Sequence, residues 1–270
     1  MASGTGERSV GSVLAERLGK GHAFVVGRGA AEALRAVEAA LASAGADVAV
    51  RRVLGGDGLT CLDVRGEAMR LHDAGSALVA DLTGVSPLGC AALRLGADAL
   101  VAPLGDASEG RALVAIAASS AAGALGALGA TALVDAFPDA VEIGEALLGQ
   151  LVERDEAWGR ASDCAQVACA YLSCHPAVSR VVYPGLKADS SFEVAARTLR
   201  GGFGPFVDFG LAEGGRVSCG SLRAEGGRAV AKVERLASGM VRLTCDDADA
   251  REVVAVLERT LAAASGTVCA

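Results

Sequence analysis

The sequence lacks the features that would mark a membrane or nucleic-acid-binding protein. It has no apolar run near the roughly 18 residues that a membrane span requires. Its 25 Lys and Arg are outnumbered by 32 Asp and Glu, for a net charge of −7, and the arginines are scattered. No field therefore attracts nucleic acid or anionic lipid, and we expect neither as a partner. The N-terminal residues also lack the basic-then-apolar pattern of a signal peptide, so we expect a cytoplasmic protein.

The sequence also lacks the cysteine patterns of a metal site. It has eight cysteines, but no two stand in a C-x-x-C pair and none pairs with a histidine at zinc spacing. Cys164, Cys169 and Cys174 recur every five residues on one expected helix, which spreads them around its circumference. We therefore predict reduced, mostly buried thiols and no bound metal.

Aromatic residues are scarce, at 3%, and asparagine is absent, while alanine and glycine abound. This bias indicates a GC-rich coding sequence more than a structural demand. With 270 residues, 52% of them hydrophobic and 21% charged, the chain suits a soluble globular protein of one large or two modest domains.

Hydrophobic periodicity predicts an alternation of strands and helices, which indicates an α/β fold with a mostly parallel sheet. A break at Pro138 predicts a domain transition, with domains of residues 1–137 and residues 138–270. The expected helices cover residues 9–17, 30–44, much of 139–174, and 250–263. The expected strands cover residues 23–26, 47–53, 77–81, 98–102 and 179–183, with another strand in the small-residue segment 113–132.

The segment of residues 77–110 organises the rest of the chain. A buried strand delivers Asp81 to its C-terminal end, where open α/β sheets bind ligands. Residues 93–97 are predicted to end a helix that Gly96 closes, and the next strand begins at Asp98. The order strand, helix, strand predicts a parallel pair.

This segment resembles the Cys/Met-metabolism family of pyridoxal-phosphate enzymes, the cystathionine synthases and lyases. In that family a strand ends in Val-Asp-Asn-Thr, a Pro follows, and a Leu-Gly-Ala-Asp precedes a strand that ends in Ser-Ala-Thr-Lys. Asp81, Thr83, Pro87 and the Leu-Gly-Ala-Asp of residues 95–98 hold those places without a gap. Asp106 falls where the family has its lysine, and Pro103 and Gly105 replace the Ser and Thr. The resemblance implies a shortened fold-type I architecture without the Schiff-base lysine: an α/β domain with a mostly parallel sheet, followed by an α+β C-terminal domain.

The lysine matters because it forms the imine with the cofactor aldehyde, while the family's Asp keeps the pyridine nitrogen protonated. A carboxylate at residue 106 cannot form an imine. The chain has three lysines, Lys20, Lys187 and Lys232, and none lies near this strand end in sequence. We therefore expect no catalytic residue of the family type, and any pyridoxal phosphate to be bound noncovalently or not at all.

Other parts of the family's cofactor site are matched in part. Gly29 and Ala30 begin the helix whose N-terminal amides bind the cofactor phosphate in the family, and Arg28 replaces a Ser there. Gly55 stands about where the family's stacking Tyr would be. Asp81 takes the place of the pyridine-pairing carboxylate, although a strand-end capping role for it is equally open. Some 45 residues that the family carries upstream of the Asp strand are missing.

The resemblance continues through residues 175–211, which match the family's C-terminal domain in order. His175 precedes a proline in a turn, which favours a structural role. Ser218 stands in the family's Ser-Leu-Gly segment, and Arg242 stands where the family binds the substrate carboxylate. A guanidinium is a natural clamp for such a carboxylate, but an ion pair at a strand end is equally open for Arg242.

Three functions compete at this point. The favoured one is a non-catalytic pseudoenzyme in sulfur amino-acid or related biosynthesis, forming a homo-oligomer or a hetero-oligomer with an active paralogue or pathway enzyme. The second is an enzyme that holds pyridoxal phosphate, or a preformed amino-acid aldimine, noncovalently through Asp81, Gly29, Ser218 and Arg242. The third is a remodelled pocket with unrelated chemistry, for which Asp106 and Cys219 are candidate groups.

Overall fold

The computed structural model describes residues 9–105, 110–118, 131–133, 135–213 and 217–264. The chain forms two compact units. Unit 1 comprises Met1–Val53 and Leu62–Arg154, and unit 2 comprises Leu54–Cys61 and Asp155–Ala270. Helix α5 (Glu145–Cys174) contributes residues to both units. Because one helix belongs to both units, the division into units does not mark a linker between domains. The domain boundary after residue 137 stays a prediction.

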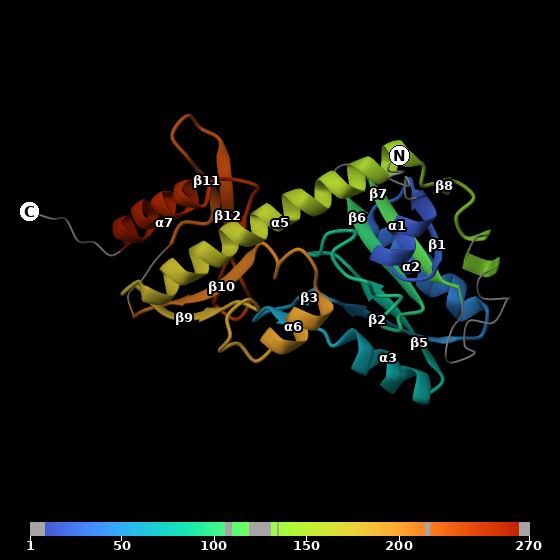
Figure 1. Cartoon of the computed structure of the whole chain (residues 1–270). Coiled ribbons are helices and arrows are strands. Elements are labelled where there is room, and N and C mark those ends of the chain that lie inside the picture. The colour runs from blue at the N-terminus through green and yellow to red at the C-terminus, as the bar shows by residue number, and fades with distance from the viewer. Residues whose placement is uncertain (1–8, 106–109, 119–130, 134, 214–216, 265–270) are drawn as a thin grey trace, which may run out of the picture. The chain divides into compact units, whose positions relative to one another are not determined.

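Unit 1 is built on a six-stranded sheet with the order β2-β5-β6-β7-β1-β8 (Figure 1). β2, β5 and β6 pair in parallel, whereas β7 is antiparallel to both β6 and β1. β1 therefore runs in the direction of β2, β5 and β6, which confirms a mostly parallel α/β sheet. The strands are β1 (Gly21–Val26), β2 (Asp47–Arg52), β5 (Ser76–Asp81), β6 (Ala99–Leu104), β7 (Arg111–Ala117) and β8 (Val141–Glu142).

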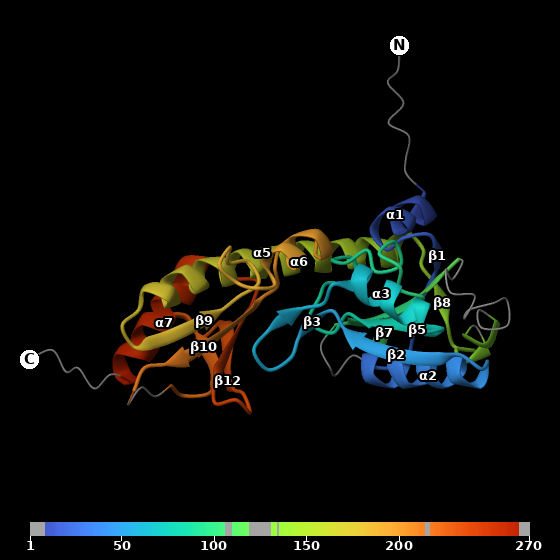
Figure 2. The same cartoon turned by 90° about the horizontal axis from the view of Figure 1, so that it is seen from below.

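Helices cover both faces of this sheet (Figure 2). α2 (Ala30–Ser43) packs Val37 and Leu41, both fully buried, onto one face. Phe24 of β1 and Phe137 join the same cluster, with ring centroids 5.6 Å apart. α1 (Val10–Arg17) and α3 (Val64–Asp73) are the other helices of unit 1 whose bounds are described. The central strands are buried on both faces because their apolar runs do not alternate with polar residues.

The connection between β5 and β6 differs from the prediction. Residues 82–98, all of which the structure describes, form turns and no helix. The predicted helix end at residues 93–97 is a single helical turn. Ala97 N donates to Ala92 O and Gly96 N donates to Leu93 O, with Gly96 at φ 109°. This is a Schellman closure, so the glycine signal was correct and the helix before it was too short to form more than one turn.

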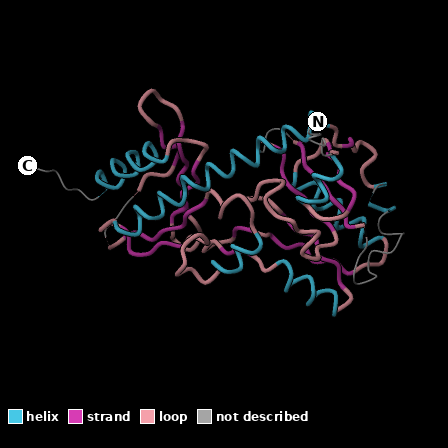
Figure 3. Tube along the Cα trace, in the orientation of Figure 1, coloured by secondary structure: helices cyan, strands magenta, loops and turns pink. Residues whose placement is uncertain are grey.

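The long helix also starts later than its periodicity suggested. Residues 139–174 were expected to be largely helical, but α5 begins at Glu145. Val141 and Glu142 form β8 instead and pair with Val25 and Phe24. Gly144 O accepts the first helical hydrogen bond, from Leu148 N. From there α5 is one unbroken helix of 30 residues (Figure 3).

Unit 2 contains an antiparallel sheet with the order β11-β12-β13-β10-β9. Tyr183 is fully buried beside it, and its hydroxyl lies 3.2 Å from Ser162 O and 3.3 Å from Gly204 O. A small hairpin, β3 (Leu54–Gly55) and β4 (Thr60–Cys61), belongs to the same unit. The remaining elements are β9 (Val178–Val182), α6 (Phe192–Thr198), β10 (Phe206–Leu211), β11 (Gly220–Arg223), β12 (Ala229–Arg235), β13 (Val241–Cys245) and α7 (Ala250–Ala264).

The cysteines in the described part of the chain are free thiols. Cys164, Cys169 and Cys245 are buried, whereas Cys174 and Cys219 are exposed. Burial raises the pKa of the Cys169 thiol to about 11 and also raises that of Cys245. Such thiols stay protonated and unreactive near neutral pH. In the same described residues no group of side chains is arranged to hold a metal ion, and no helix has the length and apolarity to cross a bilayer.

Glu67 on α3 provides a test of this fold in unit 1. Its carboxylate accepts hydrogen bonds from Arg70 and from Arg51 of β2, which lower its pKa from 4.5 to about 2. A depressed pKa stabilises the fold above the unfolded-state pKa, and this stability is lost as the pH falls through the folded-state pKa. Glu67→Gln should therefore destabilise unit 1 by about 1 kcal/mol or less at pH 7.

The difference between Glu67→Gln and wild type should shrink as urea denaturation is repeated from pH 5 toward about pH 2. Glu38→Gln, at an exposed position in the middle of α2, is the matched control and should change little at any pH. A Glu67→Gln effect that is constant across this range would contradict the ion-pair assignment.

Candidate functional site

The candidate cofactor residues of unit 1 follow strands that point the same way. Asp81 is the last residue of β5, and Gly29 and Ala30 follow the end of β1. The carboxyl ends of such strands lie at one edge of the sheet, where α/β proteins bind ligands. The structure thus brings Asp81, Gly29 and Ala30 to one edge. Asp106, two residues beyond the end of β6, lies outside the described residues.

Asp81 is held by the protein itself. Its side chain is 7% exposed; Oδ1 accepts a hydrogen bond from Thr83 N at 2.8 Å, and Oδ2 accepts one from Arg52 Nε at 3.1 Å. Arg52 ends β2 and stands directly opposite Asp81 in the parallel register. The sequence interpretation missed Arg52, although the two arginines that end the strand of residues 47–52 were a signal. Both carboxylate oxygens therefore have partners without a ligand.

A second carboxylate lies at the turn between β1 and α2. Asp139 accepts hydrogen bonds from Gly27 N at 3.3 Å and from Arg28 Nη2 at 3.4 Å. Gly29 is the N-cap of α2 and has no side chain with which to cap it. Helix N-termini attract anions, but at this turn the Asp139 carboxylate already accepts from the Gly27 amide and pairs with Arg28. The sequence interpretation missed Asp139, which is far from the turn in sequence.

No lysine occupies the carboxyl edge of the sheet in the described part of unit 1. Lys20 is the only lysine of this unit's sequence, and it immediately precedes β1, at the opposite end of that strand. Lys187 and Lys232 belong to unit 2, where Lys232 pairs with Glu234 at 3.0 Å. The described residues of unit 1 therefore offer no lysine for an imine at this edge.

Arg242, the predicted substrate clamp, is engaged in unit 2. Its Nε and Nη2 donate to the two carboxylate oxygens of Asp208, each at 2.7 Å, and Nη2 also donates to Gly56 O at 2.6 Å. The guanidinium also lies over the ring of Phe206. Asp208 is fully buried and the Arg242 side chain is 13% exposed. This bidentate pair raises the pKa of Arg242. The clamp role of Arg242 stays a prediction.

The other predicted substrate residue, Ser218, is exposed in the loop before β11. Arg242 lies on β13, and β12 separates β11 from β13 in the sheet. These two residues belong to unit 2, whereas Asp81, Gly29 and Ala30 belong to unit 1. Gly55, at the place of the family's stacking Tyr, ends β3, and Gly56 beyond it accepts the bond from Arg242. The Nδ1 atom of His175 accepts a bond from Ala177 N, as expected of a structural turn residue.

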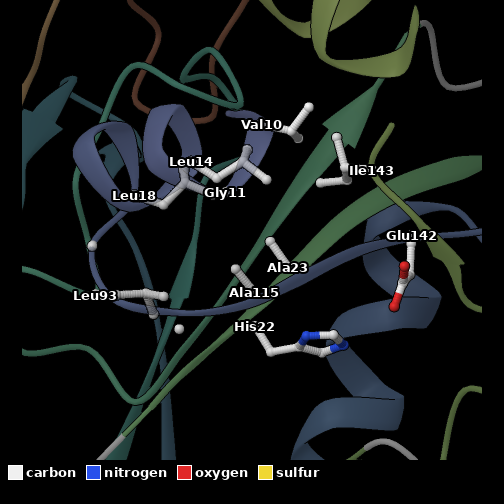
Figure 4. A pocket seen from close by; sticks show the side chains of 12 residues that line it. Val10, Gly11, Leu14, Leu18, His22, Ala23, Leu93, Ala115, Glu142 and Ile143 are labelled. Carbon is white, nitrogen blue, oxygen red and sulfur yellow. The ribbon is translucent and has the colours of Figure 1, made fainter. Parts of the chain in front are cut away.

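A cavity of about 240 Å³ in unit 1 lies away from these residues (Figure 4). Apolar side chains of α1, including Leu14, and Ile143 form one side, and His22 and Glu142 lie toward the other. His22 is at the amino end of β1, whereas Asp81 is at a carboxyl end. This cavity is therefore separate from the candidate cofactor edge.

The pair of Arg242 and Asp208 generates a stability prediction. Arg242→Gln removes one partner of a buried pair and leaves the Asp208 carboxylate without its cation, which should destabilise unit 2 by about 3–5 kcal/mol. Arg160→Gln is a matched control, because Arg160 forms an equally bidentate but exposed pair with Asp247 at 2.8 Å. That control should cost much less, because water screens the exposed pair. Urea denaturation measures both, and equal losses would contradict the importance of burial.

Neither a protein-family model nor a curated protein matches this sequence. Solved structures do match. A cystathionine gamma synthase from Xanthomonas oryzae pv. oryzae, in complex with cystathionine, has 18% identity and a TM-score of 0.70, over 96% of this chain and 85% of the other. A cystathionine gamma-lyase from Lactobacillus plantarum, complexed with L-serine, has 17% identity and a TM-score of 0.70, over 98% and 91%.

An apo methionine gamma lyase from Micromonospora echinospora has 22% identity and a TM-score of 0.61, over 84% of this chain and 68% of the other. At these identities the likeness establishes the fold alone. It agrees with the architecture that the residues around Asp81 and residues 175–211 implied. The chain has the fold-type I architecture of the cystathionine synthases and lyases.

Proposed function

We propose that this chain is a non-catalytic relative of the transsulfuration enzymes that acts as a partner subunit in sulfur amino-acid or related biosynthesis. The observation that carries the proposal is the absence of a lysine from the carboxyl edge in the described part of the Asp81 sheet. Without that amine no imine can form with a cofactor or a substrate carbonyl at this edge. The fold is kept although the group that the chemistry needs is missing, which favours a role for its surfaces.

The charges at the edge support the same proposal. Asp81 is neutralised by Arg52, and its other oxygen is held by Thr83 N. At the turn where the family binds a phosphate, Asp139 takes the Gly27 amide and pairs with Arg28. Where the protein's own groups already pair the charged side chains of a site, a ligand adds little binding free energy.

A cytoplasmic location is part of the proposal, because the free thiols of the described residues suit a reducing compartment.

Noncovalent binding of pyridoxal phosphate is the second candidate. It is favoured by one observation, that a buried carboxylate, Asp81, and a 14-residue helix that starts after Gly29 share the carboxyl edge. Bound pyridoxal phosphate supplies an electron sink for reactions at an amino-acid α-carbon. The present residues would contribute a carboxylate and backbone amides to such a site, but no amine.

The two candidates make different predictions for added cofactor. If the chain is a non-catalytic partner subunit, titration of the full chain with pyridoxal phosphate should leave the absorbance of the cofactor between roughly 320 and 430 nm equal to that of the free compound. Borohydride treatment should then fix no pyridoxyl group to Lys20, Lys187 or Lys232. A saturable spectral change without fixation would favour the noncovalent candidate. A phosphopyridoxyl-lysine peptide in the mass spectrum would contradict both candidates.

Variants of Asp106 make the titration with pyridoxal phosphate more discriminating. By the gapless alignment it stands at the lysine position, so Asp106→Lys should supply the amine and Asp106→Gln should remove only the negative charge. If a cofactor pocket survives around Asp81, the Asp106→Lys variant turns yellow with pyridoxal phosphate and Asp106→Gln does not. A folded but colourless Asp106→Lys variant would exclude the pocket and leave the partner role as the remaining candidate.

The partner role predicts association. At micromolar concentration, light scattering should give a mass above the 26.8 kDa of one chain, or pull-down from the source cells should retain a partner. Val141 and Met69, 59% and 63% exposed, are large apolar residues on the surface of unit 1. We expect Val141→Asp or Met69→Asp to weaken the association, and Val167→Asp, on unit 2, to serve as the control. A monomer that retains no partner would refute the proposal.

A further inference from the structure

Unit 2 contains a cavity of its own. Its volume is about 490 Å³, against about 300 Å³ for the cavity beside α7 and about 240 Å³ for that of unit 1. Three segments form its walls: residues 58–60 of the β3–β4 hairpin, residues 180–182 of β9, and residues 186 and 188–190 before α6. All three belong to unit 2. A volume of this size accommodates a small metabolite.

The hairpin wall is held in place by hydrogen bonds to the neighbouring strands. Arg242 Nη2 donates to Gly56 O at 2.6 Å, and Ser238 N donates to the Asp57 carboxylate at 2.7 Å. Leu59, between these anchors and β4, is 1% exposed and has φ 37°. A leucine keeps such a left-handed conformation only where its surroundings fix it. The cavity is therefore preorganised on this side.

Two side chains of opposite charge line the cavity, and each has hydrogen-bonding capacity that no described residue takes up. The Arg180 guanidinium forms no hydrogen bond or ion pair with any described residue, Asp189 included. Asp189 Oδ1 accepts bonds from Ser191 N at 2.8 Å and Ser191 Oγ at 2.6 Å. Its Oδ2 accepts none from the described part of the chain. Among the described residues, the Arg180 guanidinium thus has no anionic partner and Asp189 Oδ2 has no donor, although both residues line one cavity.

The rest of the lining is mixed. Leu59 and Val182 are buried and close the wall from behind, whereas Leu186 is half-buried and offers a nonpolar surface beside the two charges. A guanidinium binds a carboxylate through paired hydrogen bonds, and a carboxylate binds an ammonium group. An aliphatic surface favours an aliphatic substituent.

We propose that this cavity binds a free α-amino acid with an aliphatic side chain. Arg180 binds its carboxylate, Asp189 Oδ2 binds its ammonium group, and the side chain packs on Leu186. A phosphate fits less well, because Asp189 repels a second negative charge in the same cavity. The proposal does not rest on the partner role, because neither Asp81 nor the lysine position takes part in it.

Calorimetric titration of the full chain with L-leucine tests the proposal. We expect saturable one-to-one binding. Two analogues each remove one charge: 4-methylpentanoate lacks the ammonium group and 3-methylbutylamine lacks the carboxylate. Each should bind at least about tenfold more weakly than L-leucine, because a charged hydrogen-bond partner is left unpaired. Inorganic phosphate serves as the simple-anion probe and should bind more weakly than L-leucine.

Variants assign the two charges. Arg180→Gln should weaken both L-leucine and 4-methylpentanoate at least about tenfold. Asp189→Asn keeps the Oδ1 acceptor for Ser191 but removes the charge, so it should weaken L-leucine and not 4-methylpentanoate. Arg235→Gln, another exposed arginine of unit 2 outside this cavity, is the matched control and should leave binding unchanged.

Several results would overturn the proposal. One is no saturable binding of L-leucine up to about 10 mM. Others are equal binding by wild type and a folded Arg180→Gln variant, and tighter binding of phosphate than of L-leucine. The analogue series uses the unaltered protein, so it decides the matter even if a variant fails to fold.

Discussion

The shared direction of β1, β2, β5 and β6 is the constraint on which unit 1 depends. Because these strands are nearly wholly apolar in their centres, polar groups gather where they end. Asp81 is therefore placed at the edge by the strand that carries it and buried by the strands beside it. A buried carboxylate needs partners, and Thr83 N and Arg52 supply them. The same constraint that builds a ligand site in other proteins here produces an edge that is satisfied from within.

Local patterns predicted the parts of this structure that local physics determines. The apolar runs gave β5 and β6, and the glycine at residue 96 correctly marked a chain reversal at φ 109°. Partners distant in sequence were not predictable in this way. Asp139 lies far along the chain from Gly27, and Asp208 lies far from Arg242; each pair forms only when the sheets have assembled. The late start of α5 has a similar cause, because pairing with β1 draws Val141 and Glu142 into a strand.

Arg242 and Arg180 show why residue type alone does not assign a binding role. A guanidinium presents the same bidentate face to a ligand carboxylate and to an aspartate side chain. The position of Arg242 on β13 places it opposite Asp208 in the antiparallel register, so the protein provides the carboxylate. Arg180 faces a cavity and has no such partner among the described residues. The difference between the two arginines is one of register and surroundings, which a single sequence does not contain.

The internal pairs also bear on how this fold is stabilised. An enzyme that binds a cofactor in its folded state alone is stabilised in proportion to the logarithm of ligand concentration over Kd. Here Arg52 faces Asp81, and Arg242 faces Asp208, in place of ligand charges. Each pair neutralises a carboxylate that is nearly or fully buried, so folding does not require a ligand to do so.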